Sequence, residues 1–309
     1  MIEDTSETVL AKRAVNRIEE IAGTFPGYRR AHAKGELYEA TFTPTGEATP
    51  FTIASHLRDS EVEAIVRFSN ISPNPSTADV LAAVKGLSVQ FLLNNGDVAN
   101  LVSITIPIFV TKSPQTFFDI LNTVKSFKDG KPHFKDMVKL FTSYPESRAA
   151  FQMIRKLKNP KSYATGRYYA VHAFYLVNEL GLRTPVKFEW EPEAGIETLS
   201  IKESASLPSD FLETEMIDRL EREEVRFRLH IIIGKQDDPT DDPTKEWPQD
   251  RQRLEAGVLR IKAKATVTKD NFIFDPTVLP TGIECSDDEI LPFRKNTYAV
   301  SYERRKKGE

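Results

Sequence analysis

The sequence predicts an α+β chain in which an antiparallel β-sheet or barrel of six to eight strands is interrupted by helices. Short runs of β-branched and aromatic residues alternate with polar residues at a period of two, which is typical of half-buried strands. Stretches with helical spacing separate some of these runs, but the regular strand–helix alternation of a parallel sheet is missing. The sequence contains no internal repeat and no low-complexity linker. We therefore expect a single domain over residues 1–309.

The first part of the chain predicts one helix followed by strands. Residues 8–23 place their apolar side chains on one stripe, as in a short amphipathic helix. Residues 65–69 and 87–91 alternate at a period of two. The run NNGD at 94–97 offers the backbone positions of a hairpin turn before a further strand at 101–104.

The second part of the chain predicts helices and then further strands. Residues 115–158 have helical spacing, and residues 209–222 read as a helix capped by Ser209 or Asp210. The runs that read as strands by alternation are 169–177, 186–190, 225–231 and 259–267.

Composition excludes several classes of function. The chain has 42 basic and 45 acidic residues, a net charge of −3, so no overall positive field favours nucleic acid or an anionic membrane. The single cysteine, Cys285, excludes a disulfide framework and a cysteine-rich metal centre. Apolar runs fall short of the ~20 residues that cross a bilayer. We expect a cytoplasmic protein that acts on small molecules, with homo-oligomerisation left open.

Two segments stand out because the Gly-rich phosphate loop, the HExxH motif and the GxSxG motif are all missing from the sequence. The segment YRRAHAKG at 28–35 is either a basic turn or a histidine, His32, placed beside arginines that hold an anion. Near the C-terminus, Arg294 and Tyr298 are four apart and would share a helix face. A neighbouring guanidinium stabilises a phenolate, and a phenolate is a hard ligand suited to ferric iron.

With these residues in view, the chain resembles the haem catalases. The family's R-x-x-H-A-K-G and V-R-F-S motifs are similar to residues 29–35 and 66–69. Its F-D-P…L-P-x-G-I-E-x-S…R-x-x-x-Y…R pattern is matched without a gap over 274–305. Further similar segments, in family order, are 85–91, 106–109, 172–178 and 242–248. The motifs together cover most of the chain and are highly specific.

The resemblance implies a catalase-like barrel of about eight antiparallel strands, with haem b between the barrel and the C-terminal helix. Tyr298 matches the tyrosinate that ligates the ferric iron of catalases. Arg294 would pair with its oxygen, and His172 and Asp288 match the residues that continue the hydrogen bonds behind that arginine. The residues that match the family's propionate-binding arginines and haem-lining phenylalanines are Arg29, Arg67, Arg305, Phe109 and Phe117.

On the other face of the haem, the resemblance implies that His32 is the acid–base group and that Ser69 orients its ring. One departure concerns a family asparagine, whose position the motif spacing gives to Thr105. A threonine hydroxyl cannot replace both the donor and the acceptor of an amide. The chain is also far shorter than a full-length catalase.

These features favour a haem peroxidase that reduces organic hydroperoxides and hydrogen peroxide with an external electron donor. A catalase that disproportionates hydrogen peroxide is the second hypothesis, which the asparagine departure disfavours. Metabolism of lipid hydroperoxides is the third, disfavoured because Ala31 stands where catalase-related allene oxide synthases carry a threonine. Haem binding without turnover is the fourth, and His32 argues against it because binding alone needs no acid–base group.

Overall fold

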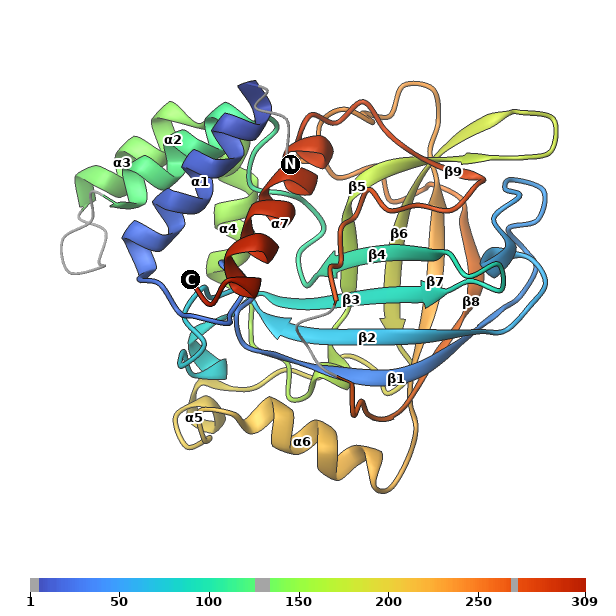
Figure 1. The fold of residues 1–309 in the computed structure, drawn as a ribbon, viewed down its shortest axis with the longest axis horizontal. Helices are drawn as coiled ribbons and strands as arrows, with labels where there is room; N and C mark the ends of the chain where they lie inside the picture. Colours follow the sequence, from blue (N-terminus) through green and yellow to red (C-terminus); the bar gives the residue numbers. More distant parts are fainter. Residues whose placement is uncertain (1–5, 126–133, 268–271) are drawn as a thin grey trace.

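The computed structural model describes residues 6–125, 134–267 and 272–309. Within this part of the chain, one antiparallel sheet forms the centre of the molecule (Figure 1). Its strands are β1 (Gly35–Pro44), β2 (Val62–Asn70), β3 (Lys85–Leu92), β4 (Val98–Ile104), β5 (Tyr168–Val177), β6 (Arg183–Pro192), β7 (Val225–Ile233), β8 (Arg253–Lys264) and β9 (Ile283–Cys285).

Eight of these strands close into a barrel, which confirms the fold class predicted from the sequence. They are hydrogen-bonded in the order β4-β3-β2-β1-β8-β7-β6-β5, and β9 pairs with β5. The ring closes where Ile104 of β4 pairs with Tyr169 of β5. Closure joins the two ends of the eight-stranded ring, and β9, which pairs with β5, is the edge strand among the described residues.

The barrel interior is filled by aromatic side chains. Phe42 contacts the edges of Phe91 and Trp190, with ring centroids 5.3 and 6.1 Å apart. The packing is so close at this point that a Cβ on Gly257 would lie 2.3 Å from the Phe42 ring. Because the interior is packed in this way, the candidate site forms outside the barrel.

Helices cover two regions of the barrel surface. Figure 1 shows α1, α2, α3, α4 and α7 grouped on one side, with α5 and α6 on another. A small apolar cluster joins the first group through Ala11 and Ala14 of α1, Phe118 of α2 and Phe293 of α7. The bounds are α1 (Ser6–Ala22), α2 (Pro114–Lys125), α3 (Phe134–Ser143), α4 (Arg148–Lys156), α5 (Ile201–Ser204), α6 (Phe211–Leu220) and α7 (Ile290–Lys306).

The structure corrects several predicted boundaries. The helical stretch predicted over 115–158 divides into α2, α3 and α4, and the strand predicted over 259–267 ends at Lys264. Asp210 occupies the N-cap of α6, but its side chain makes no capping hydrogen bond. Residue 271 and several side chains at the start of α3 lie outside the described residues. No described helix is long and apolar enough to cross a membrane.

Candidate active site

A pocket lies between the outer surface of the barrel and the helices α1, α2 and α7. Strand register builds its floor: Ser69 of β2 pairs with Gly86 of β3, which pairs with Ile104 of β4. The volume of this cavity is about 270 Å³. A single buried water needs roughly 10–15 Å³, so the cavity is large enough for an organic group and not only for one ion or water.

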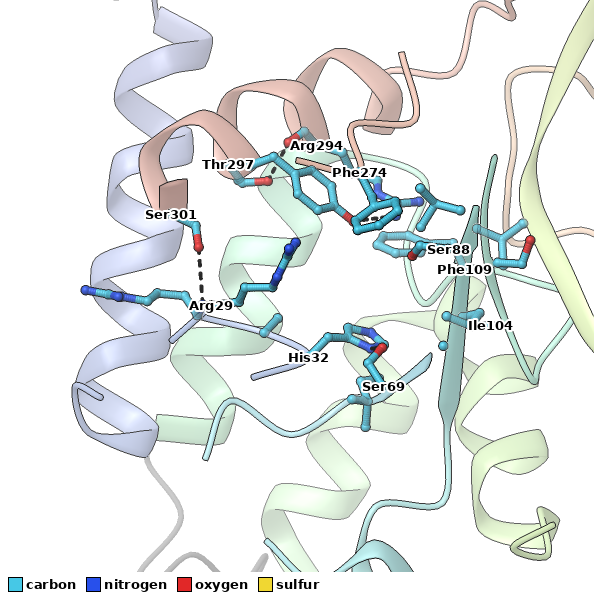
Figure 2. A pocket seen from close by; sticks show the side chains of 18 of the residues that line it. Arg29, His32, Ser69, Ser88, Ile104, Phe109, Phe274, Arg294, Thr297 and Ser301 are labelled. Carbon is cyan, nitrogen blue, oxygen red and sulfur yellow. Dashed lines mark hydrogen bonds between the residues drawn. The ribbon is translucent and has the colours of Figure 1, made fainter. Parts of the chain in front are cut away.

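His32 reaches this pocket from the loop that precedes β1. Its Nδ1 lies 3.0 Å from the Ser69 hydroxyl oxygen, and both side chains face the pocket (Figure 2). His32 is the sole non-glycine residue with a positive φ, 53°, in the described part of the chain. Such a conformation costs roughly 1–3 kcal/mol and is typical of functional sites.

The environment of His32 keeps its imidazole neutral. Burial lowers the pKa of His32 to about 3, and three nearby guanidinium charges act in the same direction. A neutral ring has one nitrogen that donates and one that accepts a hydrogen bond. Since Nδ1 is engaged with Ser69, Nε2 is the nitrogen left to exchange a proton with a ligand in the pocket.

A chain of four side chains begins at the opposite wall, with Tyr298 and Arg294 of α7, and continues behind it to His172 and Asp288. Nη2 of Arg294 donates to the Tyr298 hydroxyl oxygen at 2.9 Å, and Nη1 of Arg294 lies 2.7 Å from Nε2 of His172. His172 Nδ1 lies 2.6 Å from the buried carboxylate of Asp288. This order fixes the tautomer: Nδ1–H donates to Asp288, so Nε2 accepts from Arg294. Burial lowers the pKa of His172, consistent with a neutral ring.

Arginines and phenylalanines complete the lining of the pocket. Phe109 and Phe117 are stacked with centroids 6.1 Å apart. Arg29 and Arg305 donate to the carbonyl of Phe272 at 2.8 and 3.3 Å. The predicted residues that line the pocket directly are Arg29, His32, Arg67, Ser69, Phe109, Phe117, Arg294, Tyr298 and Arg305.

These residues fit a flat, anionic, iron-containing cofactor. Arg67 is buried, and its Nη2 donates to the backbone carbonyls of His32 and Ala33 rather than to a carboxylate of the described residues. Burial lowers the pKa of its guanidinium to about 10. A carboxylate of a bound ligand would form a bidentate ion pair with Arg67. Stacked aromatic rings offer a flat apolar wall, and the phenol of Tyr298 offers an oxygen ligand.

Thr105 is the exception, because the structure does not bring it into the pocket. Its hydroxyl oxygen accepts a hydrogen bond from the backbone N–H of Lys85 at 3.0 Å. Ile104, which pairs with Gly86, is in the pocket lining (Figure 2), and Thr105 is not. The structure therefore does not support the prediction that Thr105 lies above the cofactor. No asparagine or glutamine side chain is among the described residues that line the pocket.

Comparison with known proteins decides the family. The family model described as Catalase matches residues 18–308. The chain belongs to the catalase family. This family implies a haem cofactor and a peroxide substrate, for which the pocket has the residues described above.

Individual members of the catalase family differ in how much of their length this chain covers. It is 34% identical to a catalase-related peroxidase of Mycolicibacterium paratuberculosis, over 95% of this chain and 94% of that protein. It is 30% identical to a catalase-related peroxidase of Synechococcus elongatus, over 97% and 90% respectively. Catalase A of Pseudomonas putida is 26% identical, but only 61% of its length is covered. The similarity to the peroxidases therefore extends over nearly their whole length.

The pocket also contains residues to which the sequence prediction assigned no role. Gly86 and Ser88 of β3 and Ile104 of β4 contribute to the floor beside Ser69 and Arg67. Alternation within β3 was the available signal, because Gly86 and Ser88 are the small residues on one face of an otherwise bulky strand. Register with β2 and β4, which only the folded chain shows, was needed to place that face against His32.

Proposed function

We propose that this protein is a haem b peroxidase that reduces organic hydroperoxides, and hydrogen peroxide, with an external electron donor. Tyr298 holds the ferric iron as a tyrosinate, and Arg29, Arg67 and Arg305 bind the carboxylates of the cofactor. The observation that carries this proposal is one pocket with the His32–Ser69 pair on one wall and the Arg294–Tyr298 pair on the other.

Haem supplies a redox-active iron at which a hydroperoxide can be bound and reduced. His32 supplies the proton transfer that the reduction needs. Its neutral Nε2 accepts the proton of the hydroperoxide and returns it to the departing oxygen, so the O–O bond breaks heterolytically. Over a full turnover, one hydroperoxide, two electrons from the donor and two protons give one alcohol and one water. Ser69 holds Nδ1 and so keeps the ring orientation that exposes Nε2.

The side chains behind α7 hold a positive charge beside the phenol oxygen of Tyr298. Asp288 orients His172, and His172 in turn accepts a hydrogen bond from Arg294. The guanidinium is therefore held in place from both ends, with Nη2 directed at the Tyr298 oxygen that would ligate the iron. Mutation of residues that orient a metal ligand in this way typically lowers metal affinity or activity by about 10–100-fold.

The polarity of the pocket favours reduction of hydroperoxides over disproportionation of hydrogen peroxide. Disproportionation needs a second peroxide oriented as a reductant, which calls for a polar group beside His32. The residue beside Gly86 in the floor is Ile104, an aliphatic side chain. An aliphatic wall favours the alkyl part of an organic hydroperoxide by removing apolar surface from water.

The deciding experiment compares two activities of the haem-loaded protein. We expect oxidation of a dye by an alkyl hydroperoxide to exceed oxygen evolution from hydrogen peroxide. His32→Ala should slow the peroxide reaction by roughly 10²-fold or more while haem is retained. Oxygen evolution that dominates in the native protein would overturn the peroxidase assignment, and an unchanged rate in His32→Ala would remove His32 from the mechanism.

A further inference from the structure

The left-handed turn at His32 is held by one guanidinium. Nη2 of Arg67 donates to the carbonyl oxygen of His32 at 2.8 Å and to that of Ala33 at 3.3 Å. On the other side of the turn, the Ala33 N–H donates to the carbonyl of Ser72 at 3.0 Å. The His32 N–H donates to the carbonyl of Ile71 at 3.4 Å, so the strained backbone is held through two carbonyls and two amides.

The approach of Arg67 depends on the absence of a side chain at residue 35. A Cβ on Gly35 would lie 2.7 Å from Nη2 of Arg67 and 2.4 Å from the carbonyl oxygen of Phe68. Neither contact is tolerable, and the carbonyl belongs to backbone that cannot rotate away. Lys34, between this glycine and the turn, is tied separately by an ion pair to buried Asp79 at 2.7 Å.

Arg29 and Arg305, the other two arginines proposed to bind the cofactor carboxylates, make a different contact. Arg29 and Arg305 both donate to the carbonyl of Phe272, which is remote in sequence from the turn. A role for Arg67 as a counter-charge alone, like that proposed for Arg29 and Arg305, would not require its contacts with the carbonyls of His32 and Ala33.

We infer that Arg67 is a positioning residue that holds His32 in its left-handed turn, in addition to binding a carboxylate of the cofactor. The inference rests on the proposed role of His32 as the proton acceptor. Arg67 fixes the backbone from which the imidazole projects, while Ser69 fixes the ring. Loss of the guanidinium releases two carbonyls, and the turn relaxes toward an ordinary backbone conformation that moves Nε2 away from the peroxide.

The test measures amide hydrogen exchange at Ala33 in the haem-loaded protein, together with the rate of the peroxide reaction per bound haem. In Arg67→Ala we expect exchange at Ala33 to rise about tenfold or more, since hydrogen bonds from a charged donor are stronger than the average. We expect the peroxide reaction to slow by roughly 10–10²-fold, as for a small misplacement of a catalytic group. Arg67→Lys keeps the charge but is one bond shorter, so it should give the same two effects in weaker form.

Arg29→Lys is the matched control, because it changes a pocket arginine whose guanidinium donates to the carbonyl of Phe272. Exchange at Ala33 should stay at the native rate in that variant. Native exchange at Ala33 in both Arg67 variants, with cofactor loss equal to that of Arg29→Lys, would show that Arg67 is a counter-charge only. If Arg67→Ala does not fold, Arg67→Lys gives the same readout. An unchanged peroxide rate in His32→Ala would instead overturn the proposed function, and the exchange result would stand by itself.

Discussion

Gly86→Ala adds a single methyl group at the point where His32 and Ser69 approach strand β3 of the barrel. A Cβ on Gly86 would lie 2.7 Å from the Ser69 hydroxyl oxygen, 3.0 Å from Nδ1 of His32 and 3.1 Å from its Cε1. Ordinary contacts of this type are about 3.5–4.0 Å. The imidazole and the hydroxyl must therefore each move by several tenths of an ångström. This movement disturbs the hydrogen bond between them.

Overpacking of this size typically costs about 1–3 kcal/mol of stability, and a lost hydrogen bond adds about 1 kcal/mol. Displacement of a catalytic group by 1 Å can cost roughly 10²-fold in rate, so a shift of half that size predicts about tenfold. We expect Gly86→Ala to slow the reaction with an alkyl hydroperoxide by about tenfold or more per bound haem. Stopped-flow absorbance of the haem measures this rate directly.

Gly234→Ala supplies a matched control. Its Cβ would lie 2.7 Å from two ring atoms of Trp247, a comparable clash at a residue that does not line the pocket. Denaturant unfolding should show similar losses of stability in the two variants, and only Gly86→Ala should show the slower peroxide reaction. Equal peroxide rates in Gly86→Ala and the native protein would refute the close approach of His32, Ser69 and β3.

Three further predictions follow from the geometry. Ile104→Asn places an amide beside His32, so the ratio of oxygen evolution to dye oxidation should rise in paired assays; a ratio that falls or stays constant would contradict the account of the pocket floor. Because burial lowers the pKa of His32 to about 3, its proton-accepting form persists above that pH, and the peroxide rate should show no ionisation of His32 between about pH 5 and 8. Buried His56 has its pKa lowered to about 4, so the unfolded chain binds more protons between pH 6.5 and 4; the unfolding free energy should fall by about 3 kcal/mol as the pH drops through that window, and His56→Leu should remove this part of the pH dependence in urea titrations.

The sequence predicts the type of most elements because periodicity is a local property. The alternation in β2 and β3 and the helical spacing around Tyr298 each depend on neighbouring residues alone. The barrel order depends on pairings such as β1 with β8, which are more than 200 residues apart in the chain and leave no local signal. Closure of the barrel was therefore an expectation of the family resemblance rather than of the pattern.

The candidate site divides in the same way. Motif matches were sufficient to assemble Tyr298, Arg294, His172 and Asp288, which the folded chain joins by three hydrogen bonds. Thr105 was predicted from motif spacing alone, which does not show that its hydroxyl is used by the backbone N–H of Lys85 instead of facing the pocket. The left-handed backbone of His32 left no trace in the sequence, since no glycine or turn motif marks it.

The most direct test of the central claim is the absorbance and electron paramagnetic resonance spectrum of the purified Tyr298→Phe variant. We expect this variant to lose most of its haem, or its residual haem to lack the signal of a tyrosinate-ligated ferric iron. Tyr302→Phe, one helical turn further along α7 and also in the pocket lining, should keep the native haem content and spectrum. Native haem content and an unchanged high-spin ferric spectrum in Tyr298→Phe would contradict the account.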